Sequence, residues 1–92
     1  MMYLVAYDVE EDDVRRRVSQ TLKDAGGVRI QYSAFMIELE EHQLESLLHK
    51  LRVIIGSSKG RVTAMPLCKR DLERMVTIVR RYRLAGEESP VI

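Results

Sequence analysis

The stretch YLVAYDVEEDDVRRRV, residues 3–18, begins as an apolar run and continues as a lone aspartate, an acidic cluster and three arginines. Residues 2–7 are rich in β-branched and aromatic side chains, so they predict a strand that ends at Asp8. From about Asp12 the apolar period becomes helical, and Gly26–Gly27 supplies the stop. The stretch therefore predicts a strand followed by a helix, with a carboxylate at the junction.

Length and composition predict one small globular domain. The chain has 92 residues, of which 46% are hydrophobic and 32% are charged, with the charges well interspersed. This length does not allow two independent cores, and we expect a domain over residues 1–80 with a tail at residues 81–92. The 15 basic and 14 acidic side chains nearly cancel, so any basic surface for nucleic acid must be local.

The sequence also predicts where the protein works. Its one cysteine, Cys68, cannot form an intramolecular disulfide, which fits a reducing compartment. The N-terminal segment lacks signal-peptide features, and its apolar run is far shorter than the ~20 residues of a membrane span. We expect a soluble cytoplasmic protein that does not bind a membrane. We also expect Cys68 to be a small buried residue, because no nearby histidine could serve as its base.

The middle of the chain predicts two strands and a second helix. Residues 28–39 are strand-like throughout but too many for one ordinary strand in so small a domain. We expect two short antiparallel strands broken near QYS, residues 31–33, with a single bulged strand as the alternative. A leucine-rich stripe predicts a helix over residues 41–55, closed by Gly56.

Two further strands complete the expected fold. Residues 61–67 predict a strand, and Pro66 places it at a sheet edge because proline cannot donate to a ladder. Residues 75–79, MVTIV, predict a fifth short strand. The order βαββαβ with an appended C-terminal strand is typical of an α+β, ferredoxin-like sandwich, in which two helices cover one face of an antiparallel sheet.

The first strand is apolar on both faces, with Tyr3, Val5 and Tyr7 on one and Leu4 and Ala6 on the other. An antiparallel sheet with one face in water normally shows clean alternation, so both faces of this strand are expected to be buried. Two helices cover only one face. We therefore expect a homodimer in which a second copy covers the bare face of the sheet.

Asp8 lies at the end of the face assigned to the dimer contact, because it continues the alternation of the strand. In a two-fold dimer, a residue near the axis meets its own copy. Two facing carboxylates repel unless a cation bridges them, and Mg²⁺ or Mn²⁺ would suit their oxygens and activate water toward a phosphodiester. The alternative is that Asp8 marks a strand end or caps the following helix. Asp8 considered by itself favours this structural alternative.

Basic residues near Asp8 are also open to two interpretations. Arg15, Arg16 and Arg17 begin the first predicted helix, where they oppose its dipole, so they either pair with the preceding acids or bind phosphates. Arg29 lies in an apolar strand region close to Phe35. This pair could bind a nucleotide by charge and stacking, or it could be an edge-strand charge beside a core aromatic.

The strings YLVAYDV, DDVRRRV, RIQYSAF and MPLC, in this order within residues 2–80, resemble the small CRISPR-associated spacer-acquisition protein family. This family is the smaller of the two Cas proteins that act together in adaptation. The resemblance implies a ferredoxin-like homodimer in which Asp8 of each chain faces its copy and can hold Mg²⁺ or Mn²⁺. It also implies a metal-dependent endonuclease acting on RNA or DNA, a scaffold that binds DNA, and an integrase subunit as partner.

Carried over by position, the resemblance assigns Asp8 to catalysis and metal binding. It assigns nucleic-acid contacts to Tyr7, Arg15, Arg17, Arg29 and Phe35. Arg16 has no counterpart in the family, and Met36 stands where family members often carry an acid. Two rival functions remain: a non-catalytic DNA-binding scaffold in which Asp8 is structural, and a toxin-type ribonuclease, which shares the fold and the aspartate.

Overall fold

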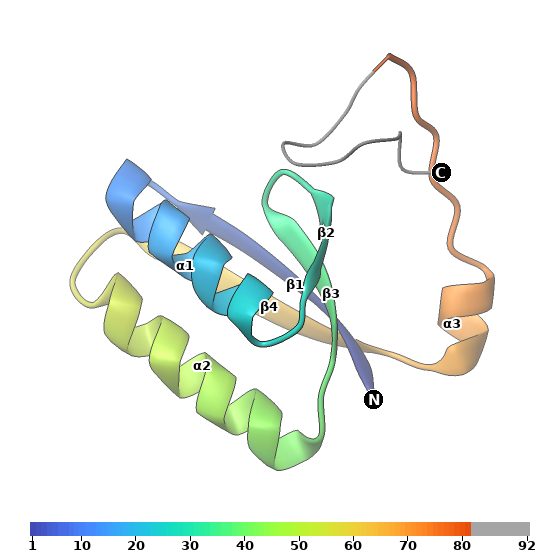
Figure 1. The fold of residues 1–92 in the computed structure, drawn as a ribbon, viewed down its shortest axis with the longest axis horizontal. Helices are drawn as coiled ribbons and strands as arrows, with labels where there is room; N and C mark the ends of the chain where they lie inside the picture. Colours follow the sequence, from blue (N-terminus) through green and yellow to red (C-terminus); the bar gives the residue numbers. More distant parts are fainter. Residues whose placement is uncertain (82–92) are drawn as a thin grey trace.

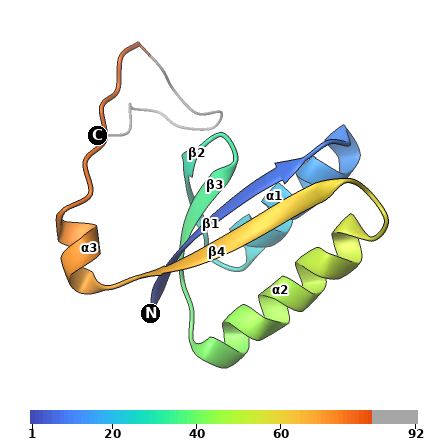
Figure 2. The same ribbon diagram turned by 180° about the vertical axis from the view of Figure 1, so that it is seen from behind.

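Residues 1–81 are described by a computed structural model, and they form an antiparallel sheet of four strands in the order β2-β3-β1-β4. The two long helices lie on one face of this sheet, in front of it in Figure 1 and behind it in Figure 2. The βαββαβ order is the expected one. The elements are β1 (Met2–Val9), α1 (Asp12–Asp24), β2 (Val28–Gln31), β3 (Ala34–Glu38), α2 (Glu41–Ile55), β4 (Gly60–Leu67) and α3 (Lys69–Glu73).

The central strand β1 is paired on both sides. Its pairing with β4 runs from Met2 opposite Leu67 to Val9 opposite Gly60, and β3 pairs with its first half. On the helix side Val5 and Tyr7 are buried, while their neighbours on the other side are only partly buried. The predicted division of these side chains between two faces is therefore confirmed, and the helices cover the face of Val5 and Tyr7.

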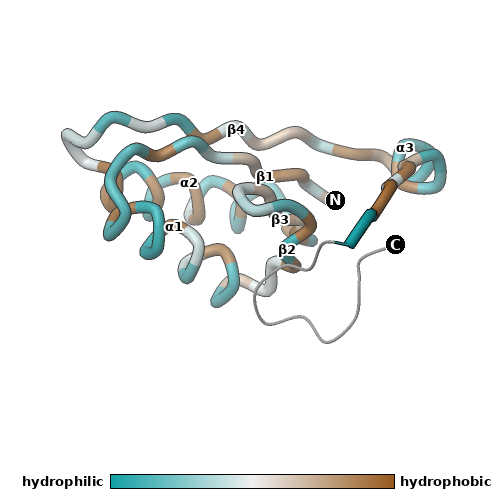
Figure 3. Tube along the Cα trace, turned by 90° about the horizontal axis from the view of Figure 1, so that it is seen from above, coloured by the Kyte–Doolittle hydropathy of each residue, from teal (hydrophilic) through white to brown (hydrophobic). Residues whose placement is uncertain are grey.

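That second face, opposite the helices, is called the open face below. Figure 3 shows it on the side of the sheet away from α1 and α2. It carries every second residue of the three strands that pair through β1. Its members are Met2, Leu4, Ala6 and Asp8 of β1, Ala34, Met36 and Glu38 of β3, and Arg61, Thr63, Met65 and Leu67 of β4.

The core lies between the sheet and the two helices. Phe35 of β3 is 0% exposed, and its ring stacks on Tyr7 with the ring centroids 6.3 Å apart. The amphipathic period of each helix supplies the opposite wall, with Val18 and Leu22 of α1 and Leu51 of α2 among the most deeply buried side chains. The single phenylalanine is thus a central core residue.

The end of α1 is fixed by a close approach to this core. Gly26 has a φ of 93°, and the N–H of Gly27 donates to the Leu22 carbonyl at 2.9 Å. A Cβ on Gly27 would lie 2.8 Å from the Leu22 carbonyl oxygen and 3.2 Å from Phe35 Cδ2. The predicted stop at the two glycines is therefore confirmed, and the second glycine is required by packing as well.

The strand-like residues 28–39 contain both features that the sequence left open. The chain turns at Tyr32 and Ser33, which separates β2 from β3 as an antiparallel pair. The register also shifts between Arg29 and Gln31, so β2 carries an irregularity as well. The expectation of two short strands is confirmed.

The expected fifth strand at residues 75–79 is wrong for the single chain. Pro66 does lie in an edge strand, since β4 ends the sheet, but after β4 the chain forms α3 and then runs away from the sheet (Figures 1 and 2). Val76 and Ile78 are 83% and 85% exposed. A strand needs a hydrogen-bonded neighbour, and this segment has none among residues 1–81.

Cys68 is exposed, so the expectation that it is buried is also wrong. Its backbone N–H and its thiol donate to the Asp71 carboxylate, at 3.1 and 3.0 Å, and this pair caps the short helix α3. These two hydrogen bonds, the thiol first, hold the pKa of Asp71 below its ordinary value. Cys68 is therefore the N-cap residue of α3 and not part of the core.

Two remaining expectations concern the ends of the chain and the membrane. Apart from its first residue, the tail expected at residues 81–92 lies outside the described part of the chain. Within the described part, no helix combines the length and apolar character needed to cross a bilayer.

The position of Phe35 generates a stability prediction. Phe35→Ala should lower the free energy of unfolding by about 3–5 kcal/mol, because it leaves a cavity between the sheet and both helices. Tyr32→Ala, which truncates a ring that is 63% exposed, is the matched control and should cost less than about 1 kcal/mol. Urea unfolding at one fixed protein concentration measures both, and equal losses would contradict the assigned core.

Candidate functional site

Asp8 lies at the end of β1 with its side chain exposed on the open face. It borders a hollow of about 380 Å³ that is lined by Asp8, Glu10, Lys59, Gly60 and Arg61. The Glu10 N–H donates to the Lys59 carbonyl at 3.1 Å, which ties the end of β1 to the loop before β4. The hollow therefore has a fixed backbone frame and combines two carboxylates with two cations.

The start of β4 is held tightly against the backbone that carries Asp8. A Cβ on Gly60 would lie 3.2 Å from Val9 Cγ2 and 3.4 Å from the Asp8 carbonyl oxygen. Asp8 pairs directly with Arg61 in the β1–β4 register. Directly opposed residues in an antiparallel pair share a face, so the Arg61 side chain belongs to the same surface as the Asp8 carboxylate.

Arg15 and Arg16 pair with acidic side chains, as one of the two interpretations of the sequence proposed. Arg15 Nη2 forms an ion pair with Asp12, and Arg16 Nη2 forms one with Asp13, each three residues earlier on α1. Arg15 Nη1 also donates to the Val9 carbonyl at 2.9 Å. Arg15 is therefore anchored beside the end of β1, on the helix side of the sheet.

Arg17 is exposed on α1 and forms no ion pair with any residue in the range 1–81. The Arg17 guanidinium can bind a phosphate at little cost in free energy, because no existing contact has to break. Among the three arginines of α1, this one has its donors available.

Arg29 is folded onto the protein instead of reaching into solvent. Its Nη2 donates to Ser19 Oγ at 2.5 Å, and its guanidinium carbon lies 5.2 Å from the Phe35 ring centroid and 6.0 Å from that of Tyr32. Its Nε is buried and has no hydrogen-bond partner among the described residues. Arg29 therefore bridges β2 and α1 on the helix side.

Phe35 does not fit the expected contact with a base or sugar. The ring is 0% exposed, and Arg29 lies over it, so a base could stack on it only if the core opened. Tyr7 is 5% exposed and is likewise a core ring. Both rings belong to the core that holds Arg29 and β1 in place, and among residues 1–81 the exposed aromatic ring is that of Tyr32.

The predicted site residues thus fall on opposite faces of the sheet. A second hollow, of about 340 Å³, lies on the helix side and is lined by basic and aromatic side chains. Four cations border it: Arg15, Arg16, Lys23 and Arg29. Asp8 borders the first hollow, on the open face, and Arg61 and Lys59 are its cationic neighbours there. The sequence did not identify these two, because strand register cannot be read from composition.

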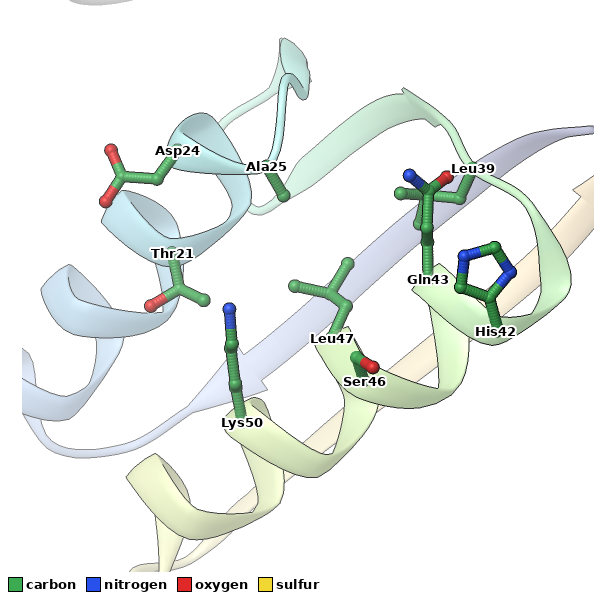
Figure 4. A pocket seen from close by; sticks show the side chains of 9 residues that line it. All are labelled: Thr21, Asp24, Ala25, Leu39, His42, Gln43, Ser46, Leu47 and Lys50. Atoms are coloured by element: carbon green, nitrogen blue, oxygen red, sulfur yellow. The ribbon is translucent and has the colours of Figure 1, made fainter.

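A third hollow, of about 440 Å³, lies between α1 and α2. Figure 4 shows Asp24 on one helix and Lys50 and His42 on the other, around the apolar Leu47. These side chains mix charges and hydroxyl groups without a nucleophile placed beside a base. Because it lies on the helix side, this hollow does not share a surface with Asp8.

The donor chemistry near Asp8 fits a hard divalent cation, although one chain cannot complete the site. Within residues 1–81, no group of three His, Cys, Asp or Glu side chains is close enough to hold a metal ion. Asp8 offers exposed carboxylate oxygens, the ligands that Mg²⁺ and Mn²⁺ prefer, and Glu10 lines the same hollow.

Comparisons with known proteins place the chain in a family. Residues 1–75 match the family described as CRISPR associated protein Cas2. The chain is 43% identical over 72 residues to the CRISPR-associated endoribonuclease Cas2 of Desulforudis audaxviator, covering 78% of this chain and 68% of that protein. The chain therefore belongs to the Cas2 family, which agrees with the resemblance in its motifs and not with the toxin-type alternative.

Two further relatives bear on fold and context. The crystal structure of Streptococcus pyogenes Cas2 superposes with a TM-score of 0.76 at 27% identity, covering 86% of this chain and all of that one (100%). The chain is also 28% identical over 78 residues to a CRISPR-associated endonuclease Cas1/endonuclease Cas2 fusion of Thermoproteus tenax. This match covers 85% of the chain and 30% of the fusion. The ferredoxin-like topology is thus a property that the chain shares with a solved Cas2.

The Arg29–Ser19 contact generates a prediction about the stability of the fold. Ser19→Ala should lower the free energy of unfolding by about 1–3 kcal/mol, because a guanidinium that is already partly buried loses a hydrogen-bond partner. Ser46→Ala, at an exposed position on α2, should change it by less than about 0.5 kcal/mol. Urea unfolding measures both, and equal effects would show that the Ser19 contact adds no stability.

Proposed function

We propose that the protein is a homodimeric, metal-dependent endonuclease of CRISPR adaptation that also serves as a scaffold in the integration complex. The observation that carries this proposal is the position of Asp8, an exposed carboxylate at the end of a sheet face that is otherwise largely apolar. Family membership supports the pathway, and the name endoribonuclease borne by the Desulforudis relative supports the chemistry.

The dimer is proposed from the open face. Both long helices pack on the other side of the sheet, which leaves Leu4, Ala6, Met36 and Met65 on a surface without a helix. Met65 is 42% exposed, and the other three are partly buried. Burying such a surface against its own copy is favourable by about 25 cal/mol per Å² of apolar area, and in a two-fold arrangement it brings the two Asp8 ends together.

The exposed segment at residues 75–79 supports the same assembly. Val76 and Ile78 are the most exposed large apolar side chains among residues 1–81. The resemblance to the family implies a last strand that pairs with the sheet of the partner, and the β-rich MVTIV segment has no strand neighbour among residues 1–81. Pairing with the second copy would satisfy its backbone and cover these side chains.

In the proposed mechanism, Asp8 of each copy supplies carboxylate oxygens to one Mg²⁺ or Mn²⁺. An ion held there would supply Lewis-acid chemistry, activating water and polarising the phosphodiester. The chain itself contributes orientation, because the β1–β4 pairing fixes the Asp8 backbone. The apolar open face would exclude water once the second copy covers it. Arg15 and Arg17, at the same end of the fold, bind flanking phosphates.

The helix-side hollow extends the proposed nucleic-acid surface. Four cations around it, together with the exposed ring of Tyr32, suit a phosphate backbone and a stacked base. Either RNA or DNA satisfies this chemistry, since neither contact reads the sugar. The fusion of Cas1 and Cas2 in Thermoproteus tenax supports Cas1 as the integrase partner of this chain.

A substitution in the open face tests the dimer. Met65→Glu should dissociate it at micromolar concentration, because each copy would bury a carboxylate in an apolar contact. Val53→Glu, at a 65% exposed position on the outer side of α2, should leave it intact. Sedimentation velocity distinguishes the two, and a parent protein that is monomeric at these concentrations would refute the shared site.

Removal of the carboxylate tests the chemistry. Asp8→Ala should reduce Mn²⁺-dependent cleavage of RNA and DNA oligonucleotides at least about 100-fold, because the ion loses its ligands. Asp24→Ala, an aspartate on the helix side, should cleave like the parent. Sedimentation of the same samples must show an intact dimer.

The outcome of this experiment also separates catalysis from scaffolding. Cleavage that persists in Asp8→Ala would exclude the Asp8 mechanism. If no sample cleaves but the parent binds DNA in a salt-sensitive way that Arg17→Gln weakens, the scaffold role stands and the nuclease role is lost.

A further inference from the structure

Arg61 is the charged residue that the fold places directly against Asp8. The two residues oppose each other in the β1–β4 register, share the open face and line the same hollow. Arg61 is exposed, and it forms no ion pair or side-chain hydrogen bond with residues 1–81. Its guanidinium therefore has all its donors available beside the carboxylate.

The other arginines near Asp8 are placed or engaged differently. Arg15 is tied to Asp12 and to the Val9 carbonyl, and Arg29 is folded between Ser19 and Phe35 on the helix side. Neither can reach the open face without breaking these contacts. A phosphate at the Asp8 carboxylate would therefore meet Arg61 first.

We propose that Arg61 binds the phosphate group of the nucleic-acid strand that lies at Asp8. This inference rests on the proposed function, and it assigns to that site a residue of β4 that the motifs of the sequence did not single out. A planar guanidinium suits the task, because it donates two parallel hydrogen bonds to phosphate oxygens. Lys59 lines the same hollow but precedes β4, and its side chain is not fixed by the strand register.

Charge balance gives Arg61 a second consequence for the same site. In a two-fold site, two Asp8 carboxylates carry two negative charges and two Arg61 side chains carry two positive ones. A divalent ion then enters a neutral site instead of a dianionic one, so its binding is weaker than the carboxylates alone would give. The excess positive charge after metal binding attracts the phosphate.

An edge-strand cation has a simpler possible role, which is to prevent association of sheet edges. That role requires only a positive charge on β4, and Arg61→Lys preserves it. Phosphate binding by a guanidinium fork requires the arginine itself. The two roles therefore differ in the behaviour of the conservative variant.

The test measures binding of a short RNA and a short DNA oligonucleotide in EDTA, as a function of salt, by fluorescence anisotropy. Arg61→Gln should weaken binding about tenfold near 0.1 M salt and lower the salt slope by about 1 to 2, since each dimer loses two phosphate contacts. Arg61→Lys should recover only part of the affinity. Arg52→Gln, an exposed arginine on α2, is the matched control and should change neither quantity.

A double-mutant cycle ties the effect to Asp8. Asp8→Ala in EDTA should tighten binding in the parent, because a carboxylate beside the bound phosphate is removed, but should have little effect in Arg61→Gln. Direct titration without nucleic acid should show Mn²⁺ binding about 3- to 10-fold tighter in Arg61→Gln. The assignment is wrong if the effects of the two substitutions on affinity are independent, so that the affinity of the double variant equals their product to within about twofold.

The remaining outcomes separate this inference from the proposed function. An Arg61→Gln protein with the affinity and salt slope of the parent refutes the role of Arg61, even if Asp8 proves catalytic. A parent protein that binds nucleic acid but does not cleave refutes the nuclease function, whereas the binding cycle still tests Arg61. Sedimentation velocity of each variant confirms that all affinities are measured on the dimer.

Discussion

The antiparallel pairing of β1 with β3 and β4 is the interaction on which the remaining structure depends. Because β1 is paired on both edges, its side chains can only point to the two faces of the sheet, and the helices cover one of these. Val5 and Tyr7 enter the core, and Asp8 emerges on the open face. The same pairing carries Arg61 to the position opposite Asp8 and Gly60 against the Asp8 backbone.

This geometry divides the basic side chains into two groups, one on each face of the sheet. On the helix side, Arg29 is held by Ser19 and by the Phe35 ring, so it stabilises the junction of β2 and α1 as well as bordering a cationic hollow. On the open face, Arg61 lies opposite a carboxylate and forms no ion pair with residues 1–81. A nucleic acid that contacts both groups must pass around the end of β1, where Arg15 is anchored to the Val9 carbonyl.

Several features could be predicted from the sequence because they depend on local periodicity. The alternation of residues 2–7, the leucine stripe of α2 and the paired glycines after α1 each agree with the structure. The errors arose where the environment decides. Cys68 was expected to be buried but caps α3, and of the two interpretations of Phe35 its enclosed ring fits the core aromatic. Residues 75–79 have strand propensity, but no strand lies beside them within the described residues 1–81.

By itself, the sequence determined the order of the elements, the two-sided apolar character of the central strand and the carboxylate at its end, because hydrophobic period and chain direction are local properties. Its motifs also identified the family. Only the tertiary structure decided which charges share a face with Asp8. Register between β1 and β4 is set by packing and hydrogen bonding across more than fifty residues of chain, from Asp8 to Arg61. That register brings Arg61 to the Asp8 surface, whereas the β2–β3 and β1–β3 registers place Arg29 on the helix side.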